Sequence, residues 1–268
     1  MLRMGVLPGA PHVRKGINRQ DAVDSRVVEL GGRTYTIGFL ADGCSGENPK
    51  KSHTEVGAKL LVEYALGQVQ LLLWQGVPME NINIDLYRRC VDYLRTIAAI
   101  TYPGVTSTQA YLDFVSNYLM CTLVGFVTDG ETKLVTFRCG DGVRIFNDDI
   151  QLVHEKAPMY VGYHVLMPNQ LKSIARKAGV EFNLTNEFES ETFAVPDLRR
   201  FAICSDGMTQ KKPGGQPGEE YVSAGDIEGI FNNDPQAPAG LQWYLNKRAQ
   251  LTPFADDVAV IELHRMSS

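Results

Sequence analysis

The first hydrophobic pattern in the chain is a pair of segments rich in β-branched and aromatic residues. These segments, AVDSRVVEL and RTYTIGFLA within residues 21–41, flank a Gly-Gly pair, which predicts a β-hairpin. The apolar residues of the next segment, 52–75, recur at helical spacing. Ser52 and Glu55 have the spacing of a capping box, so the sequence predicts that a long helix begins there.

A second pair of strands is predicted around the turn Asp129-Gly130. These strands cover residues 119–127 and 133–139, and the segments VRIF and IQLV are expected to continue them as an antiparallel meander. The other predicted elements are helices at residues 84–100, 108–118, 169–178, 224–231 and 237–250, and strands at residues 189–194, 200–204 and 258–263.

The order of these elements indicates the fold class. Blocks of antiparallel strands are separated by pairs of helices, whereas a parallel α/β fold would alternate strand and helix. Two helical layers around packed antiparallel sheets satisfy this order, so the predicted class is α+β. No repeat or linker divides the sequence, and residues 1–268 are expected to form a single domain.

Composition and charge exclude several classes of protein. Apolar residues make up 44% of the chain and charged residues 21%, as in globular proteins. The chain has 26 basic and 31 acidic residues, so its net negative charge does not attract nucleic-acid phosphates. Five widely spaced cysteines form no C-x-x-C pair, which argues against disulfides and thiolate zinc sites. We expect a cytoplasmic protein with no nucleic-acid partner and no membrane anchor.

Aspartates mark the ends of several predicted strands. Asp42, Asp141 and Asp206 each stand at the end of a strand and before a glycine, and Asp256 stands just before a strand. Asp-Gly after a strand is usually only a turn, as Asp129-Gly130 illustrates. Hairpin formation does not explain Asp42 and Asp206, because no pairing strand follows either of them.

Carboxylates gathered at one edge of a sheet sandwich would repel one another without a cation. Oxygen ligands favour Mg²⁺ or Mn²⁺ over zinc. A glycine beside an aspartate permits a tight turn and lets a peptide carbonyl approach the ion. The pattern therefore predicts a hydrolytic site with two metal ions.

The order of the motifs resembles the type-2C protein phosphatase family, in particular its bacterial members. The motifs that carry this resemblance are Asn18-Arg19-Gln20-Asp21, Ala41-Asp42-Gly43, Gly140-Asp141, Ser205-Asp206-Gly207 and Asp256-Asp257-Val258-Ala259-Val260. The resemblance implies an α-β-β-α sandwich of two antiparallel sheets flanked by helices, with a dinuclear Mn²⁺ or Mg²⁺ centre at one end of the sheets.

The same resemblance assigns roles to the aspartates. Asp42 is expected to bridge two metal ions, and the carbonyl of Gly43 to bind one of them. Asp206 and Asp256 are expected to hold the other ion. The implied nucleophile is a water activated by both metals, which attacks phosphorus in line.

Two further acids and two departures complete the implied centre. Asp21 matches a position that binds or orients metal waters, and Asp141 a position that helps to hold a third, weaker ion. Gln20 stands where the family usually has glutamate. Cys44 stands where eukaryotic members have a histidine proposed as the general acid.

Recognition of the phosphate group is open between several basic residues. The family's usual phosphate-binding arginine is absent, because Gly16 occupies its position. Arg14, Lys15 and Arg19 are the candidate replacements, and His12 is a further residue that could lie near the phosphate.

We expect a phosphoprotein phosphatase that hydrolyses phosphoserine and phosphothreonine, and we expect it to be a monomer. A small-molecule phosphomonoesterase with the same centre is an alternative, and so is an inactive pseudophosphatase that binds phosphoproteins. Residues 211–220, KKPGGQPGEE, follow Asp206 and form a Gly/Pro-rich loop, either a substrate lid or a plain surface loop.

Overall fold

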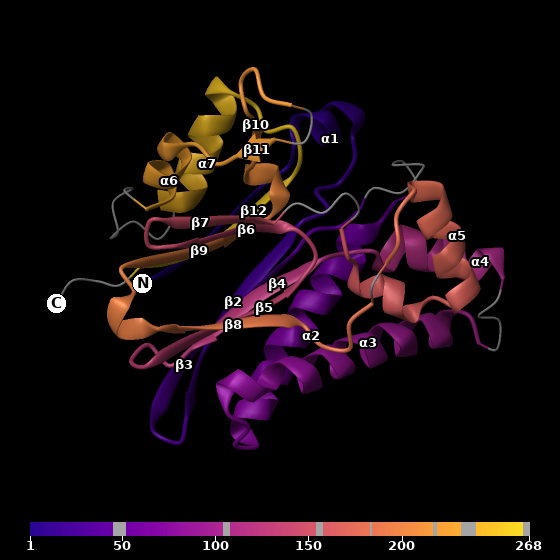
Figure 1. Cartoon of the computed structure of the whole chain (residues 1–268), viewed down its shortest axis with the longest axis horizontal. Helices are drawn as coiled ribbons and strands as arrows, with labels where there is room; N and C mark the ends of the chain where they lie inside the picture. The colour runs from indigo at the N-terminus through magenta and orange to yellow at the C-terminus, as the bar shows by residue number, and fades with distance from the viewer. Residues whose placement is uncertain are drawn as a thin grey trace.

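Two five-stranded antiparallel sheets pack face to face, with helices on both outer faces (Figure 1). The computed structural model describes residues 1–44, 52–103, 108–153, 158–182, 184–216, 219–231 and 240–264. This arrangement confirms the predicted α+β class and its four layers. Part of the predicted helix at 237–250 lies outside the described residues.

The first sheet has the strand order β1-β12-β9-β6-β7, and the second sheet has the order β2-β3-β4-β5-β8. The strands of the first sheet are β1 (Leu2–Leu7), β6 (Gly142–Phe146), β7 (Asp149–Val153), β9 (Arg200–Cys204) and β12 (Val258–His264). Those of the second are β2 (Ala22–Leu30), β3 (Arg33–Ala41), β4 (Leu123–Thr128), β5 (Lys133–Cys139) and β8 (Glu189–Ala194).

The helices form the two outer layers and one end of the molecule. Two of them cover the first sheet, namely α6 (Ala224–Phe231) and α7 (Gly240–Leu251). On the side of the second sheet lie α2 (Thr54–Trp74) and α3 (Ile82–Thr101). The remaining helices are α1 (Ala10–Lys15), α4 (Gln109–Phe114) and α5 (Pro168–Ala178).

Three groups of buried apolar residues hold these layers together. One fills the space between the second sheet and its helices, and a second lies between the first sheet and α6 and α7. The third lies between the sheets, where the rings of Phe126 and Phe201 meet edge to face at 5.2 Å. The sandwich therefore has a separate apolar core at each interface between layers.

Helix α2 is long and apolar enough to pass a composition test for a membrane span. In the structure it packs against β2 and β3 through buried residues such as Leu61, Ala65 and Val69. A core helix of a globular domain passes the same test, so the packing accounts for its apolar character.

The predicted capping box at the start of α2 is wrong. The N-cap residue is His53, and no side chain caps the helix. Ser52 instead donates a hydrogen bond to the carbonyl of Cys44, and Glu55 accepts one from Asn18. Both side chains are therefore used to tie the start of the helix to neighbouring loops.

The predicted meander is also wrong, because the chain changes sheets after β5. The β4–β5 hairpin belongs to the second sheet, whereas β6 and β7 pair with each other in the first sheet. The predicted helix at 108–118 ends as an α-helix at Phe114 and continues as a π-helix over Val115–Leu119.

Two parts of the structure add to the predicted elements. The sequence pattern predicts no element for β1, which pairs antiparallel with β12. The Gly/Pro-rich segment after Asp206 is bounded by β10 (Gln210–Lys211) and β11 (Glu220–Tyr221), which pair as a short hairpin.

Candidate metal centre

Strand ends from both sheets bring the predicted aspartates to one end of the sandwich. Asp42 follows β3 of the second sheet, and Asp206 follows β9 of the first. Asp141 lies between β5 and β6, where the chain crosses from one sheet to the other. Carboxylate oxygens of these three residues all lie within 4.8 Å of one another. Such a group of oxygens has the composition and spacing that a hard divalent cation requires.

Asp21 joins the same cluster through the register of the first hairpin. Ala22 pairs with Ala41, so the residues that flank this pair, Asp21 and Asp42, lie side by side. Asp21 is buried, and its Oδ2 accepts a 2.6 Å hydrogen bond from the hydroxyl of Ser205. Because Ser205 directly precedes Asp206, this bond links the acids of the two sheets.

Asp256 lies at the edge of the cluster. It stands two residues before β12 and is exposed. Its negative charge lies close enough to Asp206 and Asp42 to raise the pKa of both carboxyl groups. The structure therefore places all five predicted acids in one neighbourhood.

The protonation of these acids reflects their crowding. Burial, followed by the neighbouring charge of Asp257, raises the pKa of Asp21 to about 8. Burial and the charges of Asp21 and Asp206 also raise the pKa of Asp42 well above its usual value. The same two causes, with Asp256 as the neighbour, raise the pKa of Asp206. Removing a carboxylate from water and placing it beside another carboxylate both disfavour its charged form.

A divalent cation fits this donor set. Asp21 Oδ1 and Asp206 Oδ1 are buried, and within the described parts of the chain no N–H or hydroxyl group donates to either oxygen. Both carboxyl groups face that of Asp42. Buried acceptors are normally satisfied, so carboxyl oxygens that face only one another fit the place of a cation.

The backbone around the cluster requires glycine at two positions. A Cβ atom on Gly43 would lie 2.7 Å from Thr54 Oγ1, so a side chain there would push the loop away from Asp42. Gly140 has a φ of +110°, and its Cβ would lie 2.5 Å from Thr122 Cγ2. Thr122 also fixes Asp42 directly, because its Oγ1 accepts from the Asp42 N–H and its own N–H donates to the Asp42 carbonyl.

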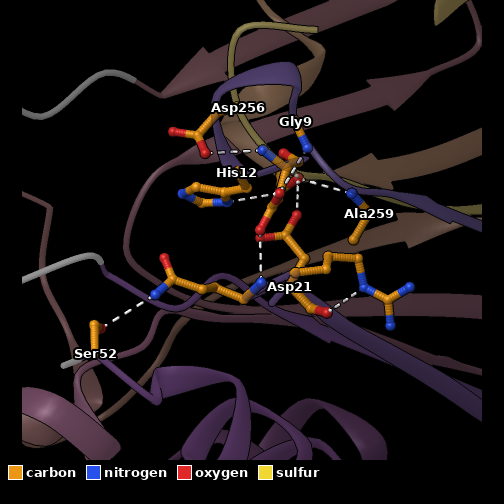
Figure 2. A network of polar contacts seen from close by, with 10 residues as sticks. Gly9, His12, Asp21, Ser52, Asp256 and Ala259 are labelled. Atoms are coloured by element: carbon orange, nitrogen blue, oxygen red, sulfur yellow. Dashed lines mark hydrogen bonds and ion pairs between the residues drawn. The ribbon is translucent and has the colours of Figure 1, made fainter. Parts of the chain in front are cut away.

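Asp257 is a buried residue beside the cluster to which the sequence analysis assigned no role. It is buried, and it accepts hydrogen bonds from the N–H groups of Gly9 at 2.7 Å and Gln20 at 2.6 Å. Its Oδ1 also lies 2.8 Å from Nδ1 of His12, and Figure 2 shows this network between Asp256 and Asp21. The carboxylate thus ties α1 and the segment before β2 to the cluster. The Asp256-Asp257 pair was a usable signal, since one of two adjacent acids before a buried strand must turn inward.

The basic residues predicted to bind phosphate differ in their surroundings. Arg14 and Lys15 are exposed near the end of α1. Arg19 is partly buried, and its Nε donates to the carbonyl of Asp21 at 3.0 Å. His12, which the sequence left open, lies beside Asp257 and next to Asp256.

The two departures from the family pattern are both enclosed. Gln20 is buried, and its side-chain amide donates to the hydroxyl of Ser52 at 3.1 Å. The Cys44 side chain shares a hydrogen bond with the side chain of Tyr160, and burial raises the pKa of its thiol. Sequence patterns gave no signal for Tyr160, which precedes the 3₁₀ segment Val161–Val165.

We expect that Cys44 is not the general acid, so Cys44→Ser should keep turnover within about tenfold of the parent. Loss of a true general acid typically lowers turnover by 10²–10⁴. The raised thiol pKa keeps this group protonated, and a serine hydroxyl retains both the donor and the acceptor toward Tyr160. Measurement of kcat in Mn²⁺ for both proteins checks the prediction. A thousandfold loss with metal affinity unchanged would instead make Cys44 a participant in the reaction.

Asp129 shows how an Asp-Gly turn without a catalytic role differs from the cluster. Its Oδ1 accepts hydrogen bonds from the N–H groups of Glu131, Thr132 and Lys133. The hydroxyl of Thr132 also donates to Oδ2, and this bond together with the N–H bonds outweighs burial and lowers the pKa of Asp129, whereas the pKa values of Asp42 and Asp206 are raised. This turn carries no feature of a cation site.

Comparison with known proteins agrees with the geometry. A family model described as protein phosphatase 2C matches residues 8–232. The fold is similar to that of a bacterial serine phosphatase, with a TM-score of 0.57 and 12% identity over 100% of this chain and 98% of the other. It is also similar to serine/threonine phosphatase Stp1 from Staphylococcus aureus, with a TM-score of 0.57 and 12% identity over 99% and 95% of the two chains. At this identity the solved structures show the shared fold alone. No curated protein matches the chain.

Proposed function

Because the chain belongs to the protein phosphatase 2C family, we propose that it is a metal-dependent phosphatase acting on phosphoserine and phosphothreonine in proteins. The observation that carries this proposal is the juxtaposition of Asp42, Asp141 and Asp206, whose carboxylate oxygens lie within 4.8 Å of one another. The buried oxygens of Asp21 and Asp206 that have no hydrogen-bond partner also support it. We further propose a monomer that works in the cytoplasm.

Mn²⁺ or Mg²⁺ is the proposed cofactor, with Asp42, Gly43, Asp206 and Asp256 as ligands of two ions. Bound there, the ions would supply the positive charge that activates a water and stabilises the phosphoryl oxygens. Asp141 is proposed to help hold a third ion. These carboxylates would make a firm site, because they come from the ends of packed strands.

The surrounding residues have positioning roles in this proposal. Ser205 orients Asp21 by donating to its Oδ2. Thr122 holds the backbone of Asp42 through both its N–H group and its carbonyl. Asp257 fixes the segment that carries Gln20 and Asp21, since it accepts the N–H of Gln20. Each contact limits the movement of an acid that would hold a metal ion or its water next to the phosphoryl group.

Turnover of p-nitrophenyl phosphate and of a phosphoserine peptide is expected with Mn²⁺ or Mg²⁺ and is expected to vanish with excess EDTA. The metal supplies a charge that no basic side chain of the cluster provides, since its five members are aspartates. Restoration of activity by added Mn²⁺ is the control for damage by EDTA. Undiminished turnover in metal-free buffer would refute the proposal, and metal binding without turnover of either substrate would favour the pseudophosphatase.

Arg14→Ala is expected to raise the KM for a phosphopeptide by about two- to fivefold, as for the loss of an exposed charge. Lys15→Ala should raise the KM less. Arginine presents a two-pronged donor to phosphate oxygens, which lysine lacks. Arg19→Ala is expected to affect kcat more than KM, because Arg19 binds the carbonyl of Asp21. Steady-state kinetics of the three variants check this prediction. If all three variants have the kcat and KM of the parent, the phosphate-binding cation lies elsewhere.

A further inference from the structure

Two adjoining hollows, together called the groove here, extend from Asp206 and Asp256 of the acid cluster to the outer face of α7. Its near part, about 410 Å³, is lined by Asp206 and Asp256 together with residues of the β10–β11 hairpin. Its far part, about 420 Å³, is lined by Trp243 and Lys247. Both parts share Gln210, Arg248 and Thr252, so the two hollows adjoin each other.

The boundary between the two parts is held by a buried network of hydrogen bonds. Asp226 is 3% exposed and accepts from Gln210, Tyr244 and Arg248 at 2.6–3.0 Å. The guanidinium of Arg248 also donates to the carbonyl of Thr252 and lies 4.0 Å from the ring centre of Phe254. A satisfied network of this kind gives the groove a fixed shape. Three residues of the short hairpin that follows Asp206 line the near part of the groove, namely Gln210, Lys211 and Glu220.

The far part of the groove presents an unusual set of side chains. Trp243 is 56% exposed, Leu251 is 80% exposed, and Lys247 lies between them on the same face of α7. The Lys247 ammonium lies 4.8 Å from the centre of the Trp243 ring. Arg248 compensates the charge of Asp226, and within the described residues Lys247 has no ion-pair partner. A large exposed aromatic beside an uncompensated cation is typical of a recognition surface.

We propose that this groove binds the polypeptide segment beside the phosphorylated residue of the substrate, and that it favours an apolar or aromatic side chain next to an acidic one. Trp243 and Leu251 would contact the apolar side chain, and Lys247 the acidic one. The inference rests on the proposed function, because the groove begins at Asp206 and Asp256, where the phosphoryl group would bind. The acidic near end and a net charge of −5 exclude nucleic acid as the occupant.

Matched phosphoserine peptides of equal length test the proposal. One peptide carries Phe-Glu before the phosphoserine, one carries Glu-Phe after it, and the third has only Gly and Ser on both sides. We expect the parent, loaded with Mn²⁺, to prefer one flanked peptide over the third by about five- to tenfold in kcat/KM. Trp243→Ala and Lys247→Glu should each bring this ratio close to one.

The chain offers matched controls on the opposite helical layer. Trp74 is 72% exposed at the end of α2, and Lys59 is exposed on the same helix. Trp74→Ala and Lys59→Glu should therefore keep the parental preference. Circular dichroism of all four variants verifies that each is folded.

A second measurement does not depend on turnover. The chain has two tryptophans, so Trp74→Phe leaves Trp243 as the sole tryptophan, which can be excited selectively over the 11 tyrosines. Titration of this variant in Mn²⁺ with both flanked peptides, carrying a non-hydrolysable phosphonate in place of the phosphate ester, should give a saturable change in emission. The Gly/Ser peptide should require a higher concentration for the same change.

The outcomes separate the groove from the proposed function. Turnover of p-nitrophenyl phosphate without discrimination between peptides would overturn the groove and leave the phosphatase intact, as would discrimination that survives both groove variants. If no substrate turns over, the phosphatase proposal fails, and the fluorescence titration alone decides: a saturable change supports the groove, and no change overturns it. A change in emission that follows protein concentration would also overturn it, in favour of a second copy of the chain.

Discussion

Asp42→Asn is expected to lower phosphatase activity by at least about a thousandfold, which corresponds to roughly 4 kcal/mol of lost transition-state stabilisation. Asp42 lies at the centre of the cluster, because both Asp21 and Asp206 face its carboxyl group. Asparagine keeps the shape of the side chain but removes its charge and one ligand oxygen. Measurement of kcat/KM for a phosphopeptide over a range of Mn²⁺ concentrations gives the size of the loss.

Asp129→Asn is the matched control for this substitution. It also lies in an Asp-Gly pair after a strand, and an asparagine Oδ1 can still accept the three backbone hydrogen bonds of the turn. The activity of Asp129→Asn should therefore equal that of the parent. In the absence of metal, Asp42→Asn should also be more stable to heat than the parent, because it removes a carboxyl group whose ionised form is disfavoured by burial and by the neighbouring acids. A protein that is fully active as Asp42→Asn would exclude this cluster as the catalytic centre.

The metal-free protein is expected to become less stable as the pH rises from about 5 to 8. The folded state raises the pKa of Asp21 from 3.8 to about 8, and burial with like charge raises those of Asp42 and Asp206 too. Between the unfolded and folded values, the folded chain therefore binds more protons than the unfolded chain. Stability must then be greatest below the unfolded pKa and fall as the pH rises through the folded one. A decrease in Tm of roughly 5 °C or more across this range is expected for a chain of this size.

Calorimetry in EDTA at pH 5 and pH 8, followed by the same scans in Mn²⁺, measures this dependence. Divalent metal should raise Tm more at pH 8 than at pH 5, since protons compete with the cation for the same oxygens. Asp21→Asn should flatten the metal-free profile, whereas a variant of exposed Asp85 should not. A metal-free Tm that rises over this range would mean that the acids are ionised without cost in the folded state.

Local sequence patterns predicted those elements whose strands pair with a neighbour in sequence. The bounds of β2 and β3 follow from alternation around a Gly-Gly turn, and four of the five candidate acids were found by their position next to a strand. The fifth, Asp21, was found only through the resemblance to the phosphatase family. Strand ends are marked by short-range turn chemistry, which a sequence carries openly. This explains why the positions of these acids were more predictable than the layout of the sheets.

The features that the sequence patterns did not predict depend on contacts between distant segments. Periodicity identifies β6 as a strand but cannot tell that it pairs with β9 rather than with β5. The role of Asp257 depends on Gly9 and Gln20, which lie more than 230 positions away in sequence. The start of α2 was misplaced for a related reason, because tertiary hydrogen bonds took the side chains that would have capped it.

The core between the two sheets acts as a spacer for the acid cluster. Asp42 is carried by one sheet and Asp206 by the other, and the rings of Phe126 and Phe201 lie between these sheets. Room for Phe126 depends on Gly38 of β3, where a Cβ would lie 2.7 Å from its ring. The volume of these remote side chains therefore sets the spacing between the acids of the two sheets. Selection on metal affinity would restrict them more narrowly than selection on folding alone, although none of them touches the site.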